Sequence, residues 1–364
     1  MFFAGGCSSA VQKTGETSSV LSYDTKNGPK ELRQSRIGDV RISGLQLRGA
    51  DFEFPYNTGL NGMTRWQDYL VYGVEGGAGN DRSTVLKALS VNLKATRAGQ
   101  AALQPAETVF NKGVLQPADD GRPGSFYRPI ADRQGYLYFT KYHGFCSYGK
   151  DKVQRENDDY GSLQLAIDPN GTAVYGWRGK LLVRGTLDQG ALKVGERYQP
   201  HGASGAFLAL SDVVIGKNHQ LYMSGRLSAV GETVPHKIGI YTPDLKQLAL
   251  VGTDGDDAAS SRGRVFPRLA LTSKHIFSWK TKDMFTEPAQ LCLWTLDGTY
   301  VGQVSAAAVL GEGWLPVEVT AWDDNSLIVG AVRITKEEEA INPENGQSHI
   351  KRTWEYGFFL VRIE

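Results

Sequence analysis

The chain has 364 residues, of which 41% are hydrophobic and 22% are charged, a composition typical of a globular protein rather than a disordered one. Its 40 lysine and arginine residues almost balance its 39 acidic residues, which gives a formal net charge of +1. That balance argues against nucleic acid as the main partner, because phosphate binding needs a clustered positive surplus. No run of 18 apolar residues is present, so we expect no membrane-spanning helix.

The chain begins with a short segment in which small residues precede a cysteine, in the order Ala4-Gly5-Gly6-Cys7. This order resembles the end of a bacterial lipoprotein signal peptide, where a pair of small residues precedes the cysteine that receives a diacylglycerol. The chain departs from that pattern at Ala4, where leucine is usual, and it lacks a basic start and a full apolar segment. A start codon further upstream, or a truncation, explains the short segment. The resemblance implies lipidation of Cys7, with 1–7 as the signal remnant; the alternative is an ordinary N-terminus with a chance cysteine.

The next segment, 8–36, is rich in Ser, Thr, Gly, Lys and Asn and holds few large apolar residues. Such a stretch buries too little surface to offset its chain entropy. We therefore expect a flexible polar tether over 8–36 and a folded body over 37–364. Because Ser8 follows the cysteine where an acidic residue indicates inner-membrane retention, the lipoprotein resemblance implies the outer membrane of a bacterial cell envelope, on either its periplasmic or its surface side.

Two short patterns recur along the body. One is a polar turn followed by a short aromatic or aliphatic strand, at 69–72, 136–139, 221–223, 276–279 and 327–329. The other is an apolar strand that ends in Thr-x-Asp, with a turn and a second strand after it. Its threonines are Thr186, Thr242 and Thr295, spaced by 56 and 53 residues. Asp and Gly after a strand supply turn chemistry, so each Thr-x-Asp copy predicts a β-hairpin.

A unit of four short strands that repeats every 50 or so residues is typical of a propeller blade. The hairpin positions fall near 92, 186, 242, 295 and 358–361. Since the first gap is close to two periods, the spacing predicts an all-β propeller of six blades, with a poorly marked blade between about 115 and 160. Five or seven blades remain possible, because 142–180 fits the pattern badly.

Both ends of the body read as strands. The stretch 39–47 alternates polar and apolar residues, and the chain ends in the apolar stretch 355–364. A ring must join its first and last blades, and closure removes exposed sheet edges. We therefore predict that the N-terminal strand completes the last blade.

The stretch from Asp132 to Tyr138, with the pattern Asp-x-x-Gly-x-Leu-Tyr, resembles the step between strands in six-bladed propellers of the TolB-like and NHL-like groups. The resemblance extends over 37–364 and implies the architecture alone. It assigns no functional residues to this chain.

One segment, from Tyr142 to Tyr148, packs a histidine, a cysteine and three aromatic residues into seven positions. Because it follows a predicted strand, we expect a loop at a face of the ring, where aromatic side chains could contact a protein or glycan ligand. The alternative is plain packing of the loop. The candidate ligand-binding residues are Tyr142, His143, Phe145 and Tyr148.

The sequence predicts no metal site and no cofactor. Asp254-Gly255-Asp256-Asp257 resembles the start of a calcium loop, but Ala258 stands where the fifth position needs an oxygen ligand, which favours an acidic turn. Cys146 and Cys292 either form a disulfide or, as we favour, are separate buried thiols.

Two functions fit these observations. The first is a lipid-anchored, extracytoplasmic binding or protein-interaction scaffold, which is favoured because we find no nucleophile elbow, P-loop or metalloprotease motif. The second is a propeller hydrolase, lactonase-like or glycan-active, with its site at the central channel. Whether the protein is an enzyme stays open at this stage, since propellers host both classes.

Overall fold

The computed structural model describes part of the chain. The described residues are 20–22, 31–47, 60–76, 83–93, 102–106, 110, 114–115, 127–141, 144–149, 154–157, 164–169, 173–198, 201–202, 205–227, 235–252, 264–281, 288–341 and 347–364.

The first three blades are antiparallel sheets, each described from its innermost strand outward. The first has β4 (Leu60–Trp66), β5 (Tyr69–Gly76), β6 (Ser83–Val91) and β7 (Leu103–Pro105), with β8 (Val114–Leu115) also on β6. The second has β9 (Tyr127–Ala131), β10 (Leu137–Lys141), β11 (Gly144–Tyr148) and β12 (Gln154–Asn157). The third has β13 (Gln164–Ile167), β14 (Ala173–Arg178), β15 (Leu181–Asp188) and β16 (Ala191–Tyr198).

The remaining blades follow the same order. The fourth has β19 (Ala209–Ile215), β20 (Leu221–Arg226), β21 (His236–Tyr241) and β22 (Gln247–Val251), preceded by the small pair β17 (His201–Gly202) and β18 (Gly205–Ala206). The fifth has β23 (Arg264–Val265) and β24 (Ala270–Leu271), both on β25 (His275–Thr281), then β26 (Gln290–Thr295) and β27 (Tyr300–Ser305). The sixth has β28 (Leu315–Ala321), β29 (Ser326–Ile341), β30 (Ser348–Ile363), β3 (Val40–Leu47), β2 (Glu31–Ile37) and β1 (Val20–Ser22).

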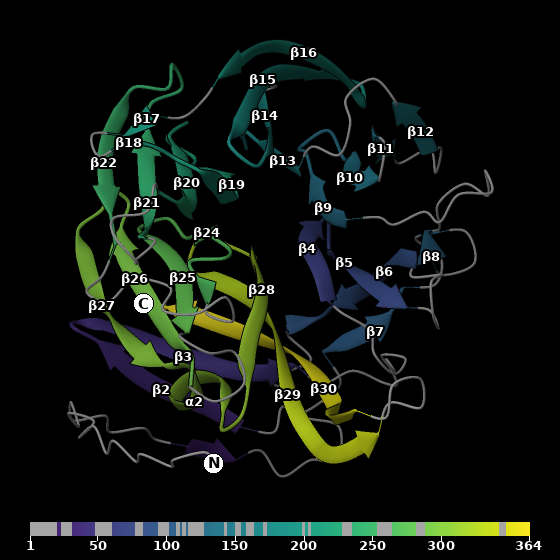
Figure 1. Ribbon diagram of the computed structural model, residues 1–364, viewed down its shortest axis with the longest axis vertical. Helices are drawn as coiled ribbons and strands as arrows, with labels where there is room; N and C mark the ends of the chain where they lie inside the picture. Colours follow the sequence, from purple (N-terminus) through teal and green to yellow (C-terminus); the bar gives the residue numbers. More distant parts are fainter. Residues whose placement is uncertain are drawn as a thin grey trace.

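The six sheets form a β-propeller (Figure 1), as the sequence predicts. Contacts join the innermost strands β4 to β9, β9 to β13, β13 to β19, and β24 to β28, and β28 returns to β4. The second blade occupies the stretch whose pattern was weakest. One short helix, α2 (Ala306–Leu310), links the fifth and sixth blades, and Ser305 caps its N-terminus by accepting the Ala307 amide. Within the described ranges, no helix is long and apolar enough to cross a membrane.

The ring is closed by both ends of the chain, which confirms the prediction for 39–47. Strand β3 pairs with β30, and the register places Ile42 opposite Ile363 and Leu47 opposite Phe358. Two further backbone hydrogen bonds of 2.8 Å join Arg41 and Glu364. The last blade therefore takes its fourth strand from the N-terminal part of the chain.

Part of the predicted tether is instead structured. Strand β2 covers 31–37 and pairs along β3, with Ser35 and Ile37 buried, and β1 adds a further short strand. The composition argument missed this because an outer strand gains backbone hydrogen bonds from its neighbour and needs few large apolar side chains. The other residues of 8–36, and all of 1–7, lie outside the described residues.

The core lies between neighbouring blades rather than inside any one of them. On β25 and β26 of the fifth blade, Trp279 and Leu293 pack toward the sixth blade, whereas Trp294 and Cys292 pack toward the fourth. Cys146 is buried in the core between the first and second blades. The two cysteines thus lie in different blades as buried thiols, as the favoured prediction had it.

The Thr-x-Asp hairpins are present in all three predicted copies, but with two kinds of turn. In two of them the threonine hydroxyl accepts a backbone amide four residues on, from Lys246 to Thr242 and from Thr299 to Thr295, each at 3.0 Å. The copy at Thr186 instead has a two-residue turn with positive φ at Gln189 and Gly190. Positive φ at both central positions is the mark of a type I′ hairpin.

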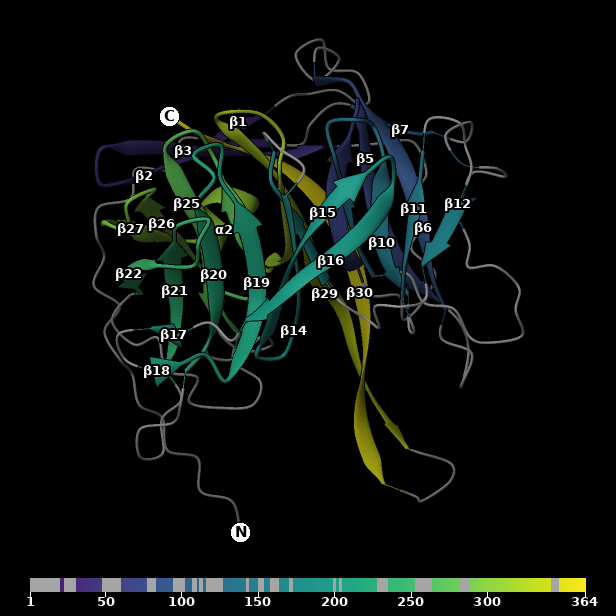
Figure 2. The same ribbon diagram turned by 90° about the horizontal axis from the view of Figure 1, so that it is seen from above.

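Strands β29 and β30 are the longest in the described structure, at 16 residues each. Their inner halves belong to the sixth blade, and their outer halves project from the body as a two-stranded arm (Figure 2). Near its end the arm carries Ile341 and Ile350, which are 71% and 54% exposed.

Candidate functional site: the central channel

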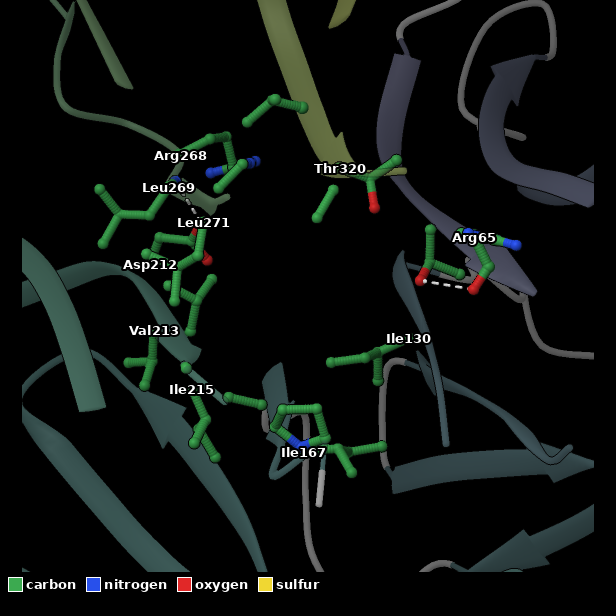
Figure 3. Close-up of a pocket in the computed structure, with 18 of the residues that line it drawn as sticks. Arg65, Ile130, Ile167, Asp212, Val213, Ile215, Arg268, Leu269, Leu271 and Thr320 are labelled. Atoms are coloured by element: carbon green, nitrogen blue, oxygen red, sulfur yellow. Dashed lines mark hydrogen bonds between the residues drawn. The ribbon is translucent and has the colours of Figure 1, made fainter. Parts of the chain in front are cut away.

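A cavity of about 800 Å³ occupies the centre of the ring. Its wall includes residues from the innermost strand of every blade, so the whole ring contributes to it (Figure 3). The middle of the wall is apolar, and the side chains that form it include Ile130, Ile167, Val213, Ile215 and Leu271. A pocket of this size with apolar walls and a few polar groups is the usual form of a small-molecule site.

Four charged side chains from four blades meet at one end of the cavity. Arg268 donates two hydrogen bonds to Glu318, from Nε to Oε2 at 2.8 Å and from Nη2 to Oε1 at 2.9 Å. Asp212 accepts the Leu269 amide on Oδ2 at 2.8 Å. Its other oxygen, Oδ1, lies 3.6 Å from Nη1 of the Arg128 guanidinium. We call Arg128, Asp212, Arg268 and Glu318 the charged layer.

Irregular pairing in the innermost strands accounts for the place of the charged layer. Strand β19 carries one extra residue, Ser211, just before Asp212, and β28 carries one extra residue just before Glu318. In β9, Arg128 and Pro129 together lie opposite one residue of β10. Arg268 lies in the gap between β23 and β24, where pairing with β25 is interrupted. A β-bulge bends a strand and redirects its side chains, and here three bulged strands and one interrupted strand carry the four residues of the charged layer.

Arg128 is held in a strained conformation. Its φ is +46°, a left-handed value that L-residues with a long side chain rarely adopt. The neighbouring strand β4 makes room for it with Gly62, where an added Cβ would lie 2.4 Å from the Arg128 Cα. The backbone of β4 thus approaches β9 more closely than any side chain allows. Strain that the fold maintains at one residue is typical of functional sites.

Burial sets the electrostatics of the charged layer. Removal from water raises the pKa of Asp212, and the nearby Arg128 and Arg268 offset that shift only in part. Removal from water, followed by the like charge of Arg268, lowers the pKa of Arg128 to about 10. Arg128 remains a cation at neutral pH, but a destabilised one.

The far end of the cavity is polar and open to solvent. Lys217 forms an ion pair with Asp324 there, and both side chains are about two-thirds exposed, at 64% and 65%. Ser273 donates a hydrogen bond to Asn325 at 3.0 Å. The channel therefore has a buried charged end, an apolar middle and a solvated polar end.

The described part of the predicted aromatic segment, 144–148, does not line this cavity. Residues 144–148 form strand β11 rather than a loop, and Phe145 and Tyr148 are each 2% exposed. Phe145 packs in the core between the second and third blades, and Tyr148 in that between the first and second. The dense aromatic composition thus reflects packing between blades. Tyr142 and His143 lie outside the described residues, as do Cys7 and the acidic stretch 254–257, so ligand contact at Tyr142 and His143 stays a prediction.

Sequence reasoning missed all four members of the charged layer. A signal was available, because Asp212 and Glu318 each interrupt an apolar strand, in Leu-Ser-Asp-Val-Val-Ile and Leu-Pro-Val-Glu-Val. A charge inside a buried strand is uncommon unless it is paired. No histidine is among the described residues that line the cavity.

The comparisons with known proteins find distant likeness in architecture. The sequence matches no protein-family model, and it has no significant match among curated proteins. The structure is similar to that of Sqt1 from Chaetomium thermophilum, at 11% identity and a TM-score of 0.47, over 85% of this chain and 96% of that one. It is also similar to virginiamycin B lyase from Staphylococcus aureus, at 12% identity and a TM-score of 0.45, over 89% and 99%. Identity this low carries no information on what this chain binds.

Proposed function

We propose that this protein is a binding module that holds a small ligand in its central channel and that a lipid on Cys7 tethers it to a bacterial membrane. The observation that supports binding is the cavity itself, about 800 Å³ in volume, with apolar walls and the charged layer at one end. Such a site gives affinity through its walls and orientation through its few polar groups. A ligand of this kind is either a free small molecule or the terminal group of a larger glycan or protein partner.

The contacts of the two buried carboxylates support binding more than hydrolysis. Glu318 accepts hydrogen bonds from Nε and Nη2 of Arg268, and Asp212 accepts one from the Leu269 amide. A general acid or base must be able to reach a substrate, and these contacts occupy both oxygens of Glu318 and one of the two oxygens of Asp212. Within the described residues, no three metal-ligating side chains converge.

One observation favours the alternative of a hydrolase. Burial raises the pKa of Asp212, the shift that a general acid needs. The alternative predicts that a compound bound in the channel is recovered cleaved, and that Asp212→Asn stops the cleavage while binding persists. Recovery of the compound intact from the wild-type protein contradicts it.

A blocked channel tests the binding proposal. Ala321 lies exposed on the cavity wall at the end of β28, so Ala321→Trp fills space that a ligand needs. The matched control is Leu248→Trp on the outer strand β22, where the side chain is 50% exposed. We expect compounds that raise the thermal midpoint of the wild-type protein to raise the midpoint of the control as well. The same compounds should not change the thermal midpoint of Ala321→Trp. An equal rise in all three proteins would place binding outside the channel.

The anchor proposal rests on the Ala4-Gly5-Gly6-Cys7 order and on the polar composition that follows it. One acyl chain binds a membrane only marginally, so stable anchoring needs more than one chain on the cysteine. We expect protein expressed with its native upstream region to label with palmitate and to partition into detergent, and Cys7→Ser to lose both properties. If the Cys7→Ser protein stays in the membrane fraction after a salt wash, the anchor is not this cysteine. With Ser8 after the cysteine, we propose the outer membrane as its location.

A further inference from the structure

We infer that the charged layer binds an anionic group of the channel ligand, a carboxylate or a phosphate ester, and that Arg128 is the residue that contacts it. This inference rests on the proposed function, because it assumes that the channel holds a ligand. It adds the chemical class of that ligand and the end of the channel at which its charge lies.

The inference begins with the hydrogen bonds of Arg128. A guanidinium carries five N–H donors. Nη2 donates to the carbonyl of the bulge residue Ser211 at 3.1 Å, but the buried Nη1 has no hydrogen-bond partner. The nearest carboxylate oxygen, Oδ1 of Asp212, is 3.6 Å away from Nη1, beyond hydrogen-bond reach. A buried charged donor without a partner is costly, and a bound oxyanion would supply that partner.

Arg268 in the same layer shows what a satisfied guanidinium looks like. Its Nε and Nη2 are on Glu318, and its Nη1 donates to the Pro267 carbonyl at 2.8 Å. All three of its nitrogens are therefore hydrogen-bonded, whereas Nη1 of Arg128 is not. The proximity of the two cations adds repulsion at Arg128 that an anion relieves.

The surroundings of Arg128 leave part of its side chain facing the cavity. The Trp177 ring lies against the guanidinium, with 5.7 Å between the ring centroid and the Arg128 Cζ. An aromatic ring contacts a guanidinium through its face and leaves the N–H donors at its edge available. Both Arg128 and Trp177 line the cavity, and the Arg128 side chain is 15% exposed. Nη1 itself is covered, so a bound anion reaches it only if the guanidinium turns toward the cavity.

The cavity also indicates the body of the ligand. Beyond the charged layer the wall is built from Ile130, Ile167 and Val213. A bare inorganic anion would leave that apolar surface uncovered, whereas the apolar part of an organic anion would cover it and gain affinity by doing so. The structure therefore favours an organic anion with an apolar body over phosphate or sulfate alone.

Matched probes test this inference by isothermal titration at neutral pH. The probes are 4-phenylbutyrate, phenyl phosphate and the neutral 4-phenylbutyramide. We expect the wild-type protein to bind at least one anion about tenfold more tightly than the amide, the range of a charge-assisted hydrogen bond. Arg128→Gln should remove that preference and leave weak amide binding. Which of the two anions binds more tightly distinguishes a carboxylate site from a phosphate site.

Two controls make the result specific. Lys217→Gln removes a cation at the open end of the same cavity and should change the preference less than about twofold, because that charge is solvated. Arg128→Lys keeps the charge but loses the planar guanidinium, so it should retain part of the preference for anions. This variant provides a second test of Arg128 if Arg128→Gln does not fold.

The outcomes separate this inference from the proposed function. If the wild-type protein binds the amide and the anions with equal affinity, and Ala321→Trp abolishes that binding, then the ligand binds in the channel but the anion site is wrong. A preference that survives Arg128→Gln in a folded protein would overturn the role of Arg128. Failure of every probe to bind the wild-type protein at millimolar concentration would count against both proposals.

Discussion

The two ends of the channel pair the same kinds of side chains in opposite environments. At the charged layer, Arg268 and Glu318 are 20% and 5% exposed and share two hydrogen bonds. At the open end, Lys217 and Asp324 also form an ion pair, but about two-thirds of each side chain is in water. Exposed pairs contribute little because water screens them, whereas loss of one partner from a buried pair leaves an uncompensated charge. Burial, not the presence of an ion pair, therefore decides what each end contributes.

Loss of Glu318 should have the largest effect. Glu318→Ala leaves the Arg268 guanidinium buried without its partner, and such a change destabilises a protein by about 3–5 kcal/mol. Urea denaturation of the wild type and the variant measures the difference. The double variant Arg268→Met with Glu318→Leu removes both charges and should recover most of the loss. If Glu318→Ala alone is neutral, the two ends of the channel are equivalent and the contrast between them disappears.

A change at Gly62 should come next, because it acts on the backbone that positions Arg128. Gly62→Ala adds a Cβ 2.4 Å from the Arg128 Cα and places an L-residue at φ +81°. We expect a loss of about 1–3 kcal/mol in unfolding free energy. Gly179→Ala is the matched control, since its φ is +59° but nothing lies within 4 Å of the added Cβ. Equal losses at both positions would mean that conformation alone, and not the close approach, matters at Gly62.

The raised pKa of Asp212 predicts a pH dependence with a definite sign. A carboxyl group whose pKa is raised by folding opposes folding once it ionises. The unfolding free energy of the wild type therefore begins to fall near the ordinary pKa of 3.8 and continues to fall until the pH passes the pKa of the folded protein. Asp212→Asn cannot ionise. The unfolding free energy of this variant relative to the wild type should therefore rise as the pH is raised from about 4 toward 7. Denaturation of both proteins across that range measures it, and a relative stability that falls with pH contradicts the burial argument.

The smallest effect is expected at the open end. Lys217→Ala breaks the ion pair with Asp324, but both groups then remain hydrated, so the unfolding free energy should change by roughly 0–0.5 kcal/mol. The same denaturation assay applies. A loss comparable with that of Glu318→Ala would show that the open end is structurally coupled to the ring.

Much of the fold was predictable from the sequence because its signals are local. The step from Asp132 to Tyr138 is one example. Asp132 accepts the Tyr136 amide at 2.8 Å and the Tyr138 hydroxyl at 2.7 Å, so the residues that suggested a turn are those that form it. Alternation likewise placed the closing strand β3. These features depend on neighbours within a few residues.

The candidate site was not predictable because it depends on how distant strands align. Bulges before Asp212 and Glu318 arise from a shift in strand register, which a single strand's sequence does not encode. The meeting of four charged residues from four blades also requires the ring to be closed. Phe145 and Tyr148 lie in cores between blades, and density of aromatic side chains does not tell a ligand site from such a core.

The sharpest test of the anion site is a crystal structure of the protein with bound 4-phenylbutyrate. We expect the phenyl group against the apolar wall and a carboxylate oxygen within hydrogen-bond distance of Nη1 of Arg128, about 2.7–2.9 Å for a charged pair. A carboxylate next to Lys217 at the open end, or a ligand bound outside the ring, would contradict this assignment.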